Sequence, residues 1–193
     1  MTTLMQEGIE FILPGIFKAY PREWAEELIR EGTLYFTNLE IFRSDENPER
    51  GDCSEGTGIF IRQGQRCTNS HANPIFVCCF TMETDRRSIL TTWDDRDTVV
   101  QICNTLTFVK RIRDAAKSTR GKIFPMQVGP VTYDKDEGSH REYYWGEAIF
   151  QKNLRFSEQK EFRFALIGDY SIQDEEHVVL KLGDCSDILR IVG

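Results

Sequence analysis

The chain has 193 residues and a formal net charge of −7, with 40% hydrophobic and 28% charged residues. This length favours a single domain, residues 1–193, with a sizeable core, and the composition is ordinary for a globular protein. The negative charge argues against a broad, nonspecific grip on nucleic-acid phosphates. Because we find neither a signal peptide nor a long apolar run, we expect a cytoplasmic protein with reduced cysteines and no membrane contact.

The N-terminal part predicts a strand, a helix and a second strand. Residues 17–20 (FKAY) end the first strand, and Pro21 suits the first turn of a helix that stops at Gly32. The apolar side chains of this helix recur at helical spacing, so one face must lie on a sheet. We predict that the second strand covers 33–43 (TLYFTNLEIFR). The charged loop that follows, 43–56, is a candidate for function, because loops on a rigid scaffold often carry binding and chemistry.

The next segment combines strands with polar sequence. Residues 58–62 (GIFIR) predict a strand, and 63–73 is polar and typical of turns. Residues 74–82 (PIFVCCFTM) form a nearly continuous apolar run, whose β-branched and aromatic content predicts a buried central strand.

Helix-capping and acidic residues at 91–97 precede apolar residues that recur at helical spacing from Val99 to Ile112. This pattern predicts the longest helix of the protein, ending before Gly121. Its end is basic, and the residues favour a solvated helix end over a site for RNA or another polyanion. The cations are Lys110, Arg111, Arg113, Lys117, Arg120 and Lys122.

The C-terminal part predicts strands. Residues 123–134 predict a bent strand or strand pair broken by prolines, and 177–182 and 188–192 predict two more strands. Residues 161–167 (EFRFALI) alternate clearly, which places Glu161 and Arg163 on one face about 7 Å apart. Two interpretations are open. Glu161 and Arg163 form a surface ion pair that holds a strand edge, which is the interpretation that the residues alone favour, or the carboxylate of Glu161 stabilises a positive charge that develops during a reaction.

Common catalytic motifs are absent from the sequence. It contains no P-loop, no G-x-G-x-x-G, no G-x-S-x-G and no H-E-x-x-H. Its three histidines do not stand at ligand spacing, so we expect no metal site.

Several short segments, in this order, resemble a family of uncharacterised bacterial and phage proteins. They include FKAY before the first helix, RGDCSEG in the charged loop, PIFVCCFT, Trp93, VTYD, Lys152 and EQKEFRF. The strand–helix–strand opening and the late strand headed by glutamate are also similar to ADP-ribosyltransferases. This resemblance implies an α+β fold with a split, mixed or antiparallel sheet, a short N-terminal helix and one long central helix.

The resemblance to ADP-ribosyltransferases also implies a substrate and a site. NAD would bind in a cleft of the split sheet, with Glu161 and Tyr35 as catalytic residues. The residues implied to bind NAD are Lys18, Tyr20, Thr37, Arg43 and Arg163, with Arg50 as another candidate for the diphosphate. The acceptor of ADP-ribose would be a macromolecule, RNA or protein, as in toxins and phage effectors, and such a protein can have an inhibitory partner.

Two other hypotheses stay open. The chain could cleave NAD by hydrolysis with the same residues, or it could be a non-catalytic binding module that contacts a partner through the acidic loop at 43–56.

Overall fold

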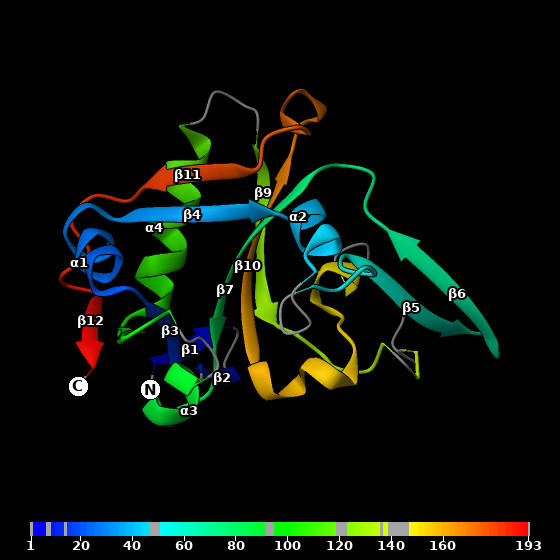
Figure 1. Cartoon of the computed structure of the whole chain (residues 1–193), viewed down its shortest axis with the longest axis horizontal. Coiled ribbons are helices and arrows are strands. Elements are labelled where there is room, and N and C mark those ends of the chain that lie inside the picture. Colours follow the sequence, from blue (N-terminus) through cyan, green and yellow to red (C-terminus); the bar gives the residue numbers. More distant parts are fainter. Residues whose placement is uncertain are drawn as a thin grey trace. The chain divides into compact units, whose positions relative to one another are not determined.

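The computed structural model describes residues 2–6, 9–13, 15–46, 51–91, 95–118, 123–135, 137–138 and 147–192 (Figure 1). The protein is mixed α+β, with a mostly antiparallel sheet and few helices, as the sequence predicts. The chain forms two compact units. Unit 1 contains Met1–Leu34, Cys79–Thr119 and Val179–Gly193, and unit 2 contains Tyr35–Cys78 and Arg120–Val178.

Unit 1 is built around three antiparallel strands. β8 (Thr98–Ile102) pairs with β3 (Ile16–Tyr20) on one side and with β12 (Leu189–Val192) on the other. β1 (Thr2–Gln6) and β2 (Ile9–Leu13) form a separate hairpin. β3 buries Ile16 and Ala19, and β8 buries Thr98, Val99, Val100 and Ile102, so residues from both faces of these strands contribute to the core of this unit.

The helices of unit 1 are α1 (Arg22–Glu31), α3 (Arg86–Thr91) and α4 (Thr105–Lys117). α1 confirms the predicted helix. α4 is the longest helix, but the prediction that it begins near Val99 is wrong. Residue 99 lies in β8, and α4 begins only after Asn104, whose side chain accepts a hydrogen bond from the N–H of Thr107. In the described part of the chain, no helix is long and apolar enough to span a membrane.

Unit 2 contains the strand that carries Glu161. This strand, β10 (Glu161–Gly168), pairs with β9 (Ile123–Pro130) on one side and with β7 (Ile75–Thr81) on the other. β7 also pairs with β4 (Thr33–Asn38). The residues of β11 (His177–Lys181) are divided between the units, with 177–178 in unit 2 and 179–181 in unit 1. Both faces of β10 are buried, so the strand lies inside the sheet rather than at a surface edge.

The second predicted strand is too long at its C-terminal end. It stops at Asn38, and residues Leu39–Ser44 form the short helix α2. The Asn38 side chain accepts a hydrogen bond from the N–H of Glu40, and this cap starts the helix where the strand pattern alone would continue. Among the described residues of unit 2, three segments are 3₁₀ helices: η1 (Glu147–Phe150), η2 (Leu154–Gln159) and η3 (Tyr170–Ile172).

A polar hairpin replaces the turn region predicted at 63–73. β5 (Thr57–Arg62) pairs in register with β6 (Gln65–Ser70). The turn between them places Gln63 and Gly64 at φ of 51° and 77°, which matches the two positive φ angles of a tight hairpin turn. β6 lacks apolar alternation because it buries little, so the periodicity of the sequence could not indicate it.

Glycine is required at the end of α1. Gly32 has a φ of 64°, and a Cβ atom at this position would lie 2.4 Å from the carbonyl oxygen of Gly183. We expect Gly32→Ala to combine backbone strain with a clash. Gly64→Ala is the matched control, because its φ is also positive but its Cβ would meet nothing within 4 Å. The control should cost about 1–2 kcal/mol of unfolding free energy, and Gly32→Ala clearly more, by urea denaturation. Equal losses would contradict the close approach.

Candidate functional site

One face of β10 carries a closed ring of alternating charges. Arg163 donates from Nη2 to Glu161 Oε2 at 2.7 Å and from Nη1 to Glu55 Oε1 at 2.8 Å. Lys152 Nζ lies 2.5 Å from Glu161 Oε1 and 3.8 Å from Glu55 Oε2. The neighbouring faces predicted for Glu161 and Arg163 are therefore confirmed. Their interpretation as a surface ion pair is wrong, because the Arg163 side chain is only 1% exposed.

A second buried pair adjoins the ring. Lys135 Nζ lies 3.8 Å from Asp52 Oδ2, and both side chains are almost fully buried. We call these charges together the charge network: Asp52, Glu55, Lys135, Lys152, Glu161 and Arg163. All belong to unit 2. With equal numbers of acids and bases, the network is formally neutral, which reduces the large cost of burying each charge alone.

The loop at Gly51–Gly56 delivers the two acids Asp52 and Glu55. Asp52 Oδ1 accepts hydrogen bonds from both the N–H and the hydroxyl of Ser54, at 3.0 and 2.7 Å. The N–H of Glu55 in turn donates to the Asp52 carbonyl oxygen at 2.8 Å. An aspartate that bonds its own backbone two residues on makes a tight turn. The local sequence D-x-S-E therefore folds the loop so that both carboxylates point inward.

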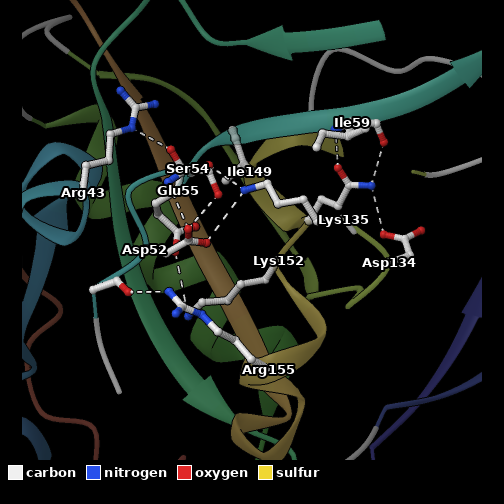
Figure 2. A network of polar contacts seen from close by, with 12 residues as sticks. Arg43, Asp52, Ser54, Glu55, Ile59, Asp134, Lys135, Ile149, Lys152 and Arg155 are labelled. Atoms are coloured by element: carbon white, nitrogen blue, oxygen red, sulfur yellow. Dashed lines mark hydrogen bonds and ion pairs between the residues drawn. The ribbon is translucent and has the colours of Figure 1, made fainter. Parts of the chain in front are cut away.

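Three basic side chains hold the backbone of the same loop (Figure 2). Lys135 donates to the carbonyl oxygen of Ser54 at 2.5 Å, and Arg43 donates to that of Glu55 at 2.7 Å. Arg155 donates to the carbonyl oxygen of Gly51 at 3.2 Å. Cationic donors bind carbonyl oxygens more strongly than neutral donors do, so the loop is fixed through its main chain as well as through its acids.

Two neutral side chains, Tyr133 and Gln151, fix segments of the chain next to the charge network. The hydroxyl of Tyr133 accepts from the N–H of Glu161 at 2.7 Å, where β10 begins. Gln151 accepts from the N–H of Ile59 and donates to the carbonyl oxygen of the same residue at 2.9 Å, and it also donates to Asp134 at 3.0 Å. Through Gln151, the hairpin β5–β6 is attached at its base to the chain segment that holds Lys135 and Lys152.

The electrostatics keep Glu161 ionised. Burial raises the pKa of this carboxyl, but the charges of Arg163 and Lys152 and their hydrogen bonds outweigh burial and lower the pKa to about 2. Burial likewise raises the pKa of Asp52, and the hydrogen bonds from Ser54 bring it below its usual value. The pKa of Lys135 is lowered because burial opposes its charge more than Asp52 and Glu55 support it.

Glu161 is the most accessible member of the charge network. Its side chain is 10% exposed, whereas the side chains of the other five are between 1% and 5% exposed. A carboxylate that is ionised at every physiological pH cannot act as a general acid, but it can stabilise a positive charge that develops nearby. The described residues contain no cluster of potential metal ligands.

The structure brings together only some of the residues implied as the NAD site. Glu161 and Arg163 share the ring, and Arg43 joins them through the Glu55 carbonyl oxygen. Tyr35 and Thr37 lie on β4 and are not part of the charge network; Tyr35 is 52% exposed.

Lys18 and Tyr20 lie on β3 in unit 1. There the Lys18 ammonium stands 5.3 Å from the ring centroid of Tyr20 and 5.4 Å from that of Phe80. These distances fit cation–π contacts within unit 1. Arg50 and Trp93 lie outside the described residues.

The basic end of α4 is partly engaged in local contacts. Arg111 donates to Asp187 at 2.7 Å, and Lys117 stands 3.6 Å from Asp114. Lys110 and Arg113 are exposed, and Arg120 and Lys122 lie outside the described residues. These contacts agree with the solvated helix end that the residues favour.

The sequence did not indicate that Asp52, Glu55 and Lys135 are buried together. The loop at 43–56 is predicted as a candidate for function and partner binding, but two of its carboxylates point inward, and among its described residues Ser44, Glu46 and Cys53 are exposed. Any partner binding through 43–56 would depend on such exposed side chains. The sequence signal that could indicate this burial is the balance of charge. Asp52 and Glu55 need cationic partners if they are buried, and Arg163 and Lys152 are two such partners.

Three sequence segments that lie far apart along the chain meet in this site. RGDCSEG supplies Asp52 and Glu55, VTYD supplies Tyr133, and EQKEFRF supplies Glu161 and Arg163 beside Lys152. Comparison of the chain with protein-family models, curated proteins and solved structures gave no match.

Removal of Arg163 should break the ring. We expect Arg163→Met to cost about 3–5 kcal/mol of unfolding free energy, because two buried carboxylates lose their shared partner. Arg22→Met is the matched control, since Arg22 pairs with Glu26 at 2.9 Å on an exposed helix face and such pairs contribute about 1 kcal/mol or less. Urea denaturation at neutral pH measures both. A loss for Arg163→Met as small as that of the control would contradict a stabilising role for the ring.

The low pKa of Glu161 should make stability sensitive to acid. The native carboxyl has a pKa of about 2 and the unfolded one a value near 4.5. Its stabilising contribution is complete above the unfolded pKa and is lost as the pH falls toward the folded pKa. The unfolding free energy of the wild type should therefore fall more steeply between about pH 5 and pH 3 than that of Glu161→Gln. Parallel pH profiles for the two proteins would show that Glu161 titrates normally.

Proposed function

We propose that this protein is an ADP-ribosyltransferase-like enzyme that cleaves NAD and transfers ADP-ribose to a macromolecular acceptor, RNA or protein, in phage–host conflict. The observation that carries the proposal is the state of Glu161. It heads β10, it is held ionised, and its side chain is the most exposed of the charge network.

Glu161 suits the chemistry of this transfer. The bond between the nicotinamide nitrogen and ribose C1′ breaks, and both electrons leave with nicotinamide. The ribose then carries oxocarbenium character, which an ionised carboxylate stabilises as in glycoside hydrolysis. An acceptor hydroxyl or amine forms the new bond to C1′ and releases its proton to solvent. Nicotinamide leaves without protonation, so the reaction needs no general acid among the side chains of the charge network.

In this proposal Lys152 and Arg163 are positioning residues. Each binds one oxygen of Glu161, so the carboxylate has a fixed orientation before any substrate arrives. Preorganised charge of this kind needs little rearrangement during the reaction. Tyr35, exposed on β4 of the same unit, is the aromatic residue proposed to act with Glu161. The roles implied for Lys18, Tyr20, Thr37 and Arg43 in binding NAD, and the split-sheet fold of the transferases, are parts of the same proposal.

Nicotinamide release from NAD tests the proposal. The wild type, with and without cell lysate, should release nicotinamide, and Glu161→Gln should release it at least about 100-fold more slowly, the usual scale for a lost electrostatic contact to a transition state. Glu55→Gln is the matched control, because it removes the same charge from the same ring at a position too buried to meet a substrate. Per folded molecule, its rate should fall much less than that of Glu161→Gln, because Glu55 acts on Glu161 only through Lys152 and Arg163.

Two outcomes would refute the proposal. One is the absence of nicotinamide release from folded wild type under every condition. The other is a Glu161→Gln rate equal to that of the wild type, which would remove Glu161 from the chemistry. Label from NAD in RNA or protein, rather than in free ADP-ribose, would distinguish transfer from hydrolysis.

A further inference from the structure

The hairpin β5–β6 differs in charge from the rest of the chain. The protein has 31 acidic residues and a net charge of −7, yet residues 56–82 contain no Asp or Glu. The hairpin itself, Thr57–Ser70, carries two arginines, Arg62 and Arg66. They flank the turn, and their cross-strand partners are Gln65 and Ile61. A locally positive ribbon on an acidic protein indicates a binding role for its surface.

The exposed side chains of the hairpin are rich in hydrogen-bond donors. They are Arg62, Gln63, Gln65, Arg66, Thr68 and Ser70. No large hydrophobic side chain is exposed in this segment. Protein interfaces usually need aromatic or aliphatic anchors, and these are missing here. Contacts to phosphate and sugar are made by arginine, amide and hydroxyl groups instead.

The hairpin is firmly attached at its base, although its outer strand buries little. Phe60 is buried, and Gln151 holds the backbone of Ile59 by its N–H and its carbonyl oxygen. In the described part of the chain β6 pairs only with β5 (Figure 1). A two-stranded ribbon is marginally stable by itself, so the six residues of β6, five of them polar, gain little from forming this strand. Their regular, exposed presentation is better explained by a ligand.

We propose that the β5–β6 hairpin binds the phosphodiester backbone of a nucleic acid. Arg62 and Arg66 pair with phosphates, and the neighbouring amides and hydroxyls donate to phosphate and sugar oxygens. Such contacts position a strand without reading its sequence. We assign to this hairpin the surface that receives the acceptor of ADP-ribose. This part of the assignment rests on the proposed function, and it narrows the acceptor from any macromolecule to a nucleic acid.

Fluorescence anisotropy of the full chain with a labelled single-stranded RNA, and with DNA of the same sequence, tests the proposal without NAD. The wild type should bind at low salt. Arg62→Glu with Arg66→Glu should weaken binding about tenfold or more, and the slope of log K against log salt should shrink by about 1.4, because each phosphate contact contributes about 0.7 for single strands.

The matched control is Arg86→Glu with Arg87→Glu, which changes the net charge equally at two exposed arginines of α3. It should weaken binding less than about threefold, since only general repulsion changes. Comparable binding of RNA and DNA supports a backbone site, and tighter binding of RNA adds contacts to the ribose hydroxyl.

Three results would overturn the proposal. The first is that folded wild type does not bind the nucleic acid, and the second is that the two double variants lose the same amount of affinity. The third is that poly-glutamate competes for the site as well as unlabelled nucleic acid does, which would make the hairpin a general polyanion site. Nucleic-acid binding without nicotinamide release would refute only the proposed enzymatic function. Nicotinamide release without nucleic-acid binding would refute only this surface.

Discussion

The sharing of one guanidinium by two carboxylates is the interaction on which unit 2 depends. Arg163 is fully buried and binds Glu161 on its own strand and Glu55 from a loop 108 residues away in sequence. A buried arginine without such partners would be very costly, because it cannot lose its proton. The strand therefore requires the loop, and the loop requires the strand. The 3₁₀ segment at Ile149 adds a carbonyl oxygen to the same guanidinium.

This dependence has an energetic consequence. Buried ion pairs are often no more stabilising than apolar residues of similar volume, because desolvation offsets much of the attraction between the charges. A network of six charges is thus a poor way to gain stability alone, although it specifies one arrangement of the loop. Its retention in a sheet otherwise packed with phenylalanine, leucine and isoleucine is the physical reason to look for function there. Within the network, Glu161 has the most exposed side chain and is the residue to which the proposed chemistry is assigned.

The sequence predicted elements well where one local rule dominated. Pro21 and Gly32 delimited α1, the apolar run at 75–81 gave a buried strand, and alternation placed Glu161 and Arg163 on one face. It failed where two rules competed. Asn38 and Asn104 cap helices inside segments whose hydrophobic pattern continues, and β6 forms a strand without an apolar face. Capping and cross-strand pairing decided these boundaries, and neither is visible in periodicity.

The sequence by itself determined the class of the protein: an α+β chain, without common catalytic motifs, in which an acidic loop and a late E-F-R-F strand carry the notable charges. Only the tertiary structure decided that these charges face each other. A carboxylate is a solvated surface group or part of a buried ring according to what lies opposite it. Here the partners of Asp52 and Glu55 are Lys135 and Lys152, which come from segments remote in the sequence. Sequence separation hides such pairings, because local patterns record the face of a strand and not its partner.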